Sequence, residues 1–130
     1  MTGVIREKSE MIRSMDPVLD NQRYIFTRVR ENAVGALAPS AFALIHEAEG
    51  WTAILPATGE EDEPQYARIT LMVSSALDGV GLTAAVASVL AANDIACNVV
   101  AALEHDHIFV PVAQGEGAVT ALKELQAAAD

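Results

Sequence analysis

The chain has 130 residues, of which 52% are hydrophobic and 20% are charged, and its formal net charge is −10. This composition excludes a disordered tail and suits one domain or two very small ones. The excess of carboxylates argues against a binder of nucleic-acid phosphates or of anionic membrane surfaces, because both classes need an excess of Lys and Arg. The first residues lack the apolar stretch of a signal peptide, and no run approaches the ~18 apolar residues of a spanning helix. We therefore expect a soluble, cytoplasmic protein with no nucleic-acid or membrane partner.

The first half of the chain predicts one helix and three strands. Apolar residues at helical spacing between Val4 and Met15 predict an N-terminal helix, which the Asp16-Pro17 pair ends. Residues 24–29 are β-branched and aromatic and alternate as a strand does. Residues 31–40 are irregular or form a short turn of helix. Residues 42–47 and 51–55 predict two more strands, the second closed by Pro56.

Four consecutive carboxylates at residues 60–63 lie between Gly59 and Pro64. Because like charges repel and such a run buries nothing, it predicts a solvated linker. This linker divides the chain into an N-terminal unit, residues 1–64, and a C-terminal unit, residues 65–130.

The C-terminal unit predicts the order β-α-β-β-α. Residues 67–74 alternate as a half-buried strand, and a turn at 77–81 leads to a helix that runs to about Asn93, with Asp78 as its N-cap. Residues 95–103 and 107–112 predict two further strands, and a last helix follows Gly117.

This order indicates an α+β sandwich that lacks one strand of a ferredoxin-like βαββαβ fold. The N-terminal unit begins with a helix and a strand, which are the missing pieces. We therefore expect the two units to be incomplete and to exchange elements, within one chain or between two.

Three parts of the sequence carry a family resemblance. They are the turn Asp78-Gly79-Val80-Gly81-Leu82 with Asn93-Asp94-Ile95, the segment 105–111, and the segments 14–19 and 47–52. The chain resembles the small stand-alone tandem ACT-domain proteins, which are similar to the regulatory part of aspartate kinase; Val80 stands where the family often has proline. The resemblance covers roughly residues 10–127. It implies a βαββαβ fold, units paired side by side, and allosteric binding of a free amino acid at their junction, but no catalysis.

The turn before the predicted helix is the candidate ligand site. A helix start offers free N–H groups and a positive dipole end, and two glycines let a carboxylate come close. Asp78 either accepts a ligand ammonium or caps the helix, and Asn98 either contacts a ligand or partner or is solvated. If Cys97 and Val99 face the helices, Asn98 faces away. The candidate residues are Asp78, Gly79, Val80, Gly81, Leu82 and Asn98.

His105 and His107 would share one face of an extended segment, as two metal ligands do. A third ligand would have to be His46 or Glu104; otherwise Asp106 sets a hairpin turn and the histidines bond locally. Cys97 in an apolar strand is typical of inert packing. We expect no metal, no cofactor and no catalytic residues.

The sequence thus predicts a regulatory or sensor module that binds a small amino acid and forms a homodimer. The alternative is a ligand-free module for protein–protein interaction or dimerisation. The N-terminal unit lacks a comparable glycine turn, so we expect it to be structural.

Overall fold

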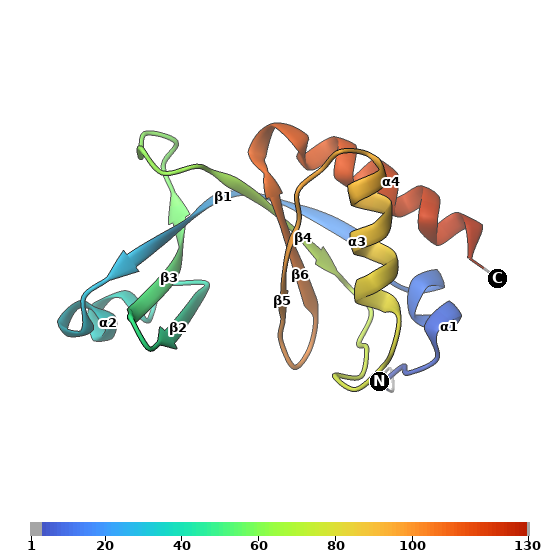
Figure 1. Ribbon diagram of the computed structural model, residues 1–130, viewed down its shortest axis with the longest axis horizontal. Helices are drawn as coiled ribbons and strands as arrows, with labels where there is room; N and C mark the ends of the chain where they lie inside the picture. The colour runs from blue at the N-terminus through green and yellow to red at the C-terminus, as the bar shows by residue number, and fades with distance from the viewer. Residues whose placement is uncertain (1–3, 130) are drawn as a thin grey trace. The chain divides into compact units, whose positions relative to one another are not determined.

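The computed structural model describes residues 4–129 and divides into two compact units (Figure 1). Unit 1 is made of Met1–Asp20 and Ala67–Asp130, and unit 2 is Asn21–Tyr66. Across residues 4–129, the structure contains no helix with both the length and the apolar character that a membrane crossing needs.

Unit 2 has the order β-α-β-β. Its elements are β1 (Pro17–Val29), which begins in unit 1, then α2 (Glu31–Leu37), β2 (Ala43–Glu47) and β3 (Gly50–Ala57). The strand order is β2-β3-β1, and both pairings are antiparallel. Trp51 on β3 lies opposite Val29 on β1 and His46 on β2, so these three side chains share one face of the sheet.

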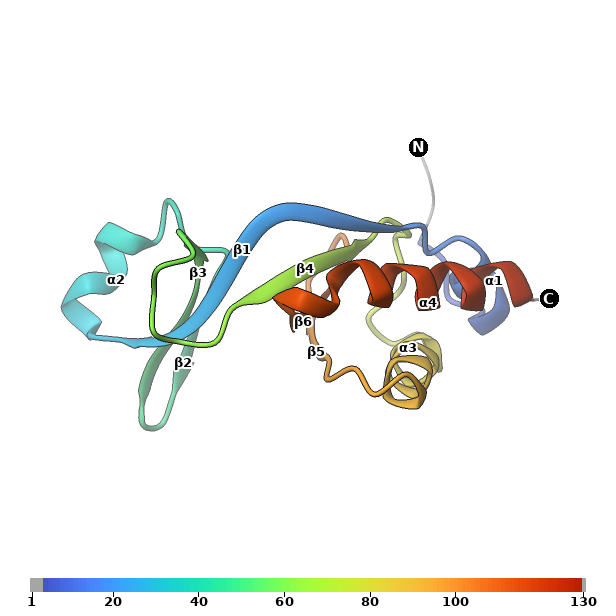
Figure 2. The same ribbon diagram turned by 90° about the horizontal axis from the view of Figure 1, so that it is seen from above.

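Unit 1 repeats this order and adds further helices. Its elements are α1 (Lys8–Arg13), β4 (Tyr66–Leu71), α3 (Leu82–Ala92), β5 (Asn98–Ala101), β6 (Asp106–Pro111), a 3₁₀ turn (Val112–Gln114) and α4 (Gly115–Ala128). Its strand order is β1-β4-β6-β5. The helices α1, α3 and α4 contact one another, as Figures 1 and 2 show, and enclose an aliphatic core with residues of β4 and β6.

The predicted exchange of elements occurs within one chain. The start of β1 belongs to unit 1, where β1 neighbours β4 and takes the place of the missing fourth strand. Next to it, the Met72 N–H donates to the Met15 carbonyl at 2.7 Å. The ferredoxin-like α+β prediction is therefore confirmed.

Several predicted element boundaries were wrong. β1 is longer than the predicted 24–29, and β5 is shorter than the predicted 95–103, because the Ile95 N–H closes the end of α3 on the Leu90 carbonyl at 2.9 Å. Pro56 does not end β3. It lies beyond the last β2–β3 pair, Ala43 with Ile54, so its missing N–H costs no ladder bond on that side.

The acidic run, residues 60–63, lies just before the boundary between the units at Tyr66 and makes local hydrogen bonds. The Glu61 carboxylate accepts hydrogen bonds from the backbone N–H groups of Thr58, at 3.0 and 3.1 Å, and of Gly59, at 3.1 Å. These hydrogen bonds lower the pKa of Glu61, and the one from the Thr58 backbone has the largest effect. The Thr27 hydroxyl donates to Glu63 at 3.0 Å. Local hydrogen bonds thus offset the repulsion that the sequence suggests.

Candidate functional site

The predicted ligand turn connects β4 to α3. Gly81, at φ 112°, is the N-cap residue of α3, and no side chain caps the helix. The prediction that Asp78 is the cap was wrong, because the loop continues three residues past it before the helix begins. Asp78 instead forms an exposed ion pair with Arg6, with 3.0 Å between Nη2 and Oδ1.

The two glycines of the turn face the N-terminal segment of the same unit. A Cβ added to Gly81 would lie 2.7 Å from Cδ of Lys8, and one added to Gly79 would lie 3.1 Å from Sδ of Met11. Ile5 is also bonded to this loop, since its N–H donates to the Ser74 carbonyl at 2.8 Å. Because neither glycine has a side chain, the N-terminal segment can pack closely against the turn.

A small hollow of about 60 Å³ lies beside the turn. The residues that line it include Ser75, Gly79, Leu82, Thr83 and Asp106. The Ser75 hydroxyl donates to the Asp106 carboxylate at 3.0 Å. Leu82 is only 3% exposed and belongs to the core, whereas Val80 is 82% exposed. One water occupies about 30 Å³ of liquid, so within one chain the hollow suits about two waters.

Asn98 lies away from the turn within one chain. It begins β5 opposite Phe109, whereas the hollow borders Ala101, at the other end of that strand. Cys97 and Val99 pack against the core and Asn98 is exposed, which agrees with the predicted alternation.

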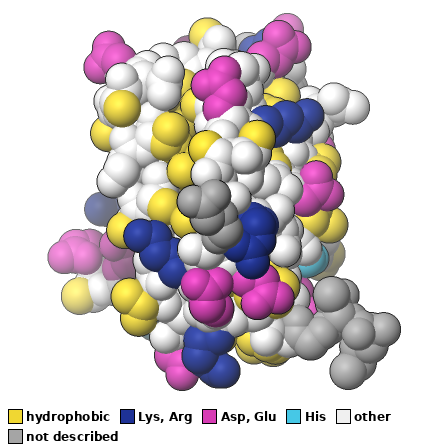
Figure 3. Space-filling model, turned by 90° about the vertical axis from the view of Figure 1, so that its right-hand side faces the viewer, with side chains coloured by type: hydrophobic (Ala, Val, Ile, Leu, Met, Phe, Trp, Pro, Cys, Tyr) yellow, Lys and Arg dark blue, Asp and Glu magenta, His cyan; other side chains and the backbone are white. Residues whose placement is uncertain are grey.

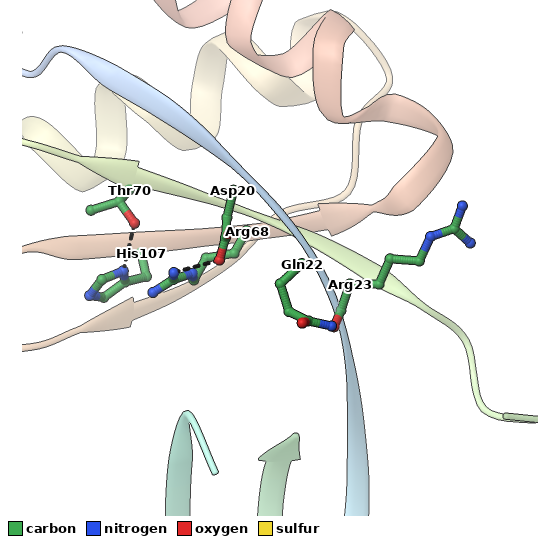
Figure 4. Close-up of polar contacts among 6 residues, drawn as sticks. All are labelled: Asp20, Gln22, Arg23, Arg68, Thr70 and His107. Atoms are coloured by element: carbon green, nitrogen blue, oxygen red, sulfur yellow. Dashed lines mark hydrogen bonds and ion pairs between the residues drawn. The ribbon is translucent and has the colours of Figure 1, made fainter. Parts of the chain in front are cut away.

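His107, on β6, belongs to a polar layer on the sheet. His107 is 9% exposed, and its Nδ1 lies 3.0 Å from the Thr70 hydroxyl (Figure 4). Burial, and then the charge of Arg68, lower the pKa of His107. Arg68 in turn binds the Asp20 carboxylate at 2.6 Å. Figure 4 shows these side chains on the side of the strands away from α3 and α4.

Of the two candidate third metal ligands, His46 and Glu104, the first is engaged elsewhere. His46 stacks on Trp51 in unit 2, with ring centroids 4.2 Å apart and parallel planes. The rings of His105 and His107 lie edge to face, with their centroids 6.5 Å apart. Within residues 4–129, no three His, Cys, Asp or Glu side chains are grouped as a metal site would require.

Sequence reasoning missed a larger pocket, of about 360 Å³, in unit 2. It lies where β1 leads into α2 and where the β2–β3 hairpin turns, the corner that corresponds to the β4–α3 turn of unit 1. In the sequence, the charged residues of this pocket are typical of a solvated surface. The pattern that could have predicted the pocket is a histidine and a tryptophan on either side of the Glu49-Gly50 turn, because a hairpin places such residues opposite each other.

Charges of both signs are mixed on one face of the molecule. On the face in Figure 3, Lys and Arg side chains lie among Asp and Glu side chains, with hydrophobic groups between them. The described part of this face therefore carries no large patch of one sign, despite the net charge of −10.

Comparison with known proteins agrees with this tandem architecture. Two ACT-domain models match the chain, one over residues 5–63 and the other over residues 63–124. The chain belongs to the ACT-domain family. The ACT-domain protein is 39% identical to a Vibrio cholerae protein of unknown function, described as a possible transport protein. That match has a TM-score of 0.76 and covers 88% of this chain and 93% of the other.

Two more distant structures share the fold of this ACT-domain protein. The ligand-free regulatory subunit of aspartate kinase from Thermus thermophilus is 10% identical, with a TM-score of 0.61 and coverage of 86% of this chain and 97% of that one. An Agrobacterium tumefaciens protein is 20% identical, with a TM-score of 0.64 and coverage of 85% and 87%. No curated protein sequence matches the chain. The predicted resemblance to tandem ACT proteins is confirmed.

Proposed function

We propose that this ACT-domain protein is a small-molecule regulatory module that binds a free amino acid at the turn 78–82. The uncapped start of α3 carries the proposal. The first N–H groups of a helix have no partner within it, and no side chain caps these. Together with the positive end of the helix dipole, they suit the α-carboxylate of an amino acid.

Asp78 is the proposed acceptor for the ligand ammonium. Its present partner, Arg6, is exposed, as Asp78 is. Exposed ion pairs contribute little because water screens both charges. A ligand ammonium can therefore replace or join Arg6 at small cost. Val80, between the two glycines, is the side chain over which such a ligand would lie.

The amino acid needs a second wall, because the hollow beside the turn has only about 60 Å³. We assign that wall to a second copy of the chain in a homodimer. β5 ends the strand order, so its outer edge is open to pairing, and Asn98 on β5 is exposed. Asn98 of a second copy would then supply an amide at the turn.

The test is a thermal-shift screen of the wild-type protein against the standard amino acids. A ligand at 100 times its dissociation constant stabilises a protein by about 2.7 kcal/mol. We expect a clear shift with one amino acid or a related group of them. Asp78→Asn and Val80→Trp should lose this shift, since both residues are exposed and neither change disturbs the core. Asp94→Asn, the same change at the other end of α3, should keep it.

The alternative function is a ligand-free interaction module. The observation that favours it is a set of exposed apolar side chains at this end of unit 1, namely Leu77, Val80 and Leu103. A flat amino-acid screen would contradict the sensor proposal. If the Val80→Asp variant then weakened self-association or partner binding, the interaction module would replace it.

A further inference from the structure

The most exposed large hydrophobic side chains of residues 4–129 lie at one end of unit 1. They are Val4, Leu77, Val80 and Leu103, which are 62% to 82% exposed, whereas the next in order, Val18, is 47% exposed. We call these four residues the apolar tip. A single exposed leucine is ordinary, but several at one place are typical of an interaction surface.

Three segments of unit 1 meet at the apolar tip. The Ala76 N–H donates to the Ile5 carbonyl at 2.9 Å, which holds the neighbouring Val4 beside the β4–α3 loop. The Ser75 hydroxyl donates to the Asp106 carboxylate at 3.0 Å, which joins the same loop to the β5–β6 hairpin. Figure 1 shows this loop and the hairpin turn at the lower end of unit 1. Four side chains that are distant in the sequence therefore share one surface of a single unit.

Local structure does not explain the two leucines of the apolar tip. The hairpin turn that contains Leu103 is tight, since the Ala102 N–H donates to the His105 carbonyl at 3.0 Å, and such turns favour Gly, Asn, Asp and Ser. Leu103 is 75% exposed and Leu77 is 68% exposed, and neither belongs to the core cluster of unit 1. Both leucines can therefore pack against another molecule without any change in the core.

A carboxylate follows each of these leucines in the sequence. Glu104, after Leu103, is exposed and has no cationic nitrogen within 4.0 Å among the described residues. Asp78, after Leu77, has only an exposed ion pair with Arg6. These carboxylates favour a partner with Lys or Arg beside its apolar side chains and disfavour an anionic membrane. They also disfavour a tip-to-tip contact between two copies of the chain, because like charges would then face each other.

We propose that the apolar tip docks a basic amphipathic segment of another protein. The apolar side of that segment packs on Leu77 and Leu103, and one of its Lys or Arg side chains pairs with Glu104. The buried apolar contacts supply most of the affinity, whereas the exposed ion pair supplies specificity and a faster encounter. The proposal names a partner for the interaction surface of unit 1. Docking needs no amino acid at the turn 78–82, so it does not depend on the ligand proposed above.

The probe is a fluorescein-labelled amphipathic helical peptide made of Leu and Lys, the Lys peptide. We would titrate it with the full-length protein and follow fluorescence anisotropy. One control peptide has Glu in place of every Lys, and a second keeps the composition but is shuffled so that its helix has no apolar face. We expect saturable binding of the Lys peptide, which weakens as salt is added, and much weaker binding of both controls. Equal binding of either control, or no saturable binding of the Lys peptide, would overturn the proposal.

The leucines are tested one at a time with a matched control. Leu77→Ser and Leu103→Ser should each weaken binding of the Lys peptide about fivefold or more, as expected when an interface side chain is lost. Their thermal midpoints should stay near that of the wild type, because both side chains are exposed. Ile45→Ser makes a similar change at an exposed position of β2 and should leave binding unchanged. An equal loss in Ile45→Ser would contradict the site.

The charge of the tip is tested in the same titration. Glu104→Gln should weaken binding of the Lys peptide and reduce its salt dependence. Glu116→Gln makes the same change at an exposed carboxylate in the first turn of α4, which follows the other end of β6, and should change neither. Equal effects of the two variants would show a general attraction to an acidic protein and overturn the docking surface.

A second copy of the chain is the competing occupant of the apolar tip. Sedimentation of the wild-type protein and of Leu103→Ser measures self-association. If Leu103→Ser dissociates a homodimer while the wild-type protein binds no Lys peptide, the tip is an interface between copies and the proposal is wrong. The amino-acid screen is a separate result: a flat screen with intact peptide binding overturns only the ligand at the turn 78–82. A thermal shift without peptide binding overturns only the docking surface.

Discussion

Units 1 and 2 share the order β-α-β-β but form their interiors from different side chains. The core cluster of unit 1 is aliphatic, and α3 buries Leu82, Val86 and Leu90 in it. In unit 2 the helix α2 has seven residues and none is buried. Five of the six aromatic residues of the chain lie in unit 2, at positions 24, 26, 42, 51 and 66. Two of its edge-to-face pairs, Tyr24 with Phe42 and Phe26 with Tyr66, have centroids 5.8 and 5.2 Å apart.

The difference shows how the same topology can either fill a corner or leave it open. Where several helices cover a sheet, aliphatic side chains are sufficient to exclude water. A unit with one short helix needs larger rings to bury the same area. At the corner after β4, the segment around Ile5–Met11 packs against unit 1 and leaves a hollow of only about 60 Å³. At the corresponding corner after β1, unit 2 retains a pocket of about 360 Å³.

The largest expected effect tests whether stability resides in the helices of unit 1. Leu90→Ala in α3 removes a side chain with no exposed surface and should cost about 2–5 kcal/mol of unfolding free energy. Leu37→Ala in α2, a partly buried position, should cost less than about 1 kcal/mol. Urea unfolding of both variants measures the difference. Equal costs would mean that the two helices support the fold alike.

A smaller effect tests the filled corner. Gly81 and Gly50 both have positive φ, 112° and 138°, so alanine at either should cost about 1–3 kcal/mol in backbone strain. Only Gly81 has a neighbour, Lys8, within 4 Å of an added Cβ; Gly50 has none. We expect Gly81→Ala to cost more than Gly50→Ala, and Lys8→Ala to remove the excess. The measurement is a double-mutant cycle of unfolding free energies. An excess that persists without the Lys8 side chain would contradict this packing.

The smallest effect concerns the pH dependence of unit 1. Burial and then Arg68 lower the pKa of His107, with a smaller lowering from His105, while Asp106 raises it. The unfolded chain therefore binds a proton near pH 6.5, before the folded protein does, and stability falls as the pH drops below that value. His107→Gln should flatten the slope of unfolding free energy between about pH 7 and 5.5. An unchanged slope would show that His107 titrates alike in both states.

Much of the fold followed from local pattern alone. The alternation in residues 67–74 and the helical spacing after Gly81 predict β4 and α3. Both predictions need only the spacing of apolar residues that are close together in the sequence. The glycine turn and the exchange of elements were also predictable, the first from composition and the second from counting strands. That Asn98 and the five turn residues 78–82 form a ligand site remains a prediction.

Other features depend on residues far apart in the chain. The polar stretch Asp20-Asn21-Gln22-Arg23 shows no strand pattern, yet it lies within β1, because the β3 ladder starts at Arg23 and Asp20 meets Arg68. The unit 2 pocket likewise joins the end of β1 to a hairpin some twenty residues later. The sequence by itself determined the order of helices and strands and the acidic character of the chain. Only the tertiary structure decided which corner is filled, since that depends on which distant segments pack there.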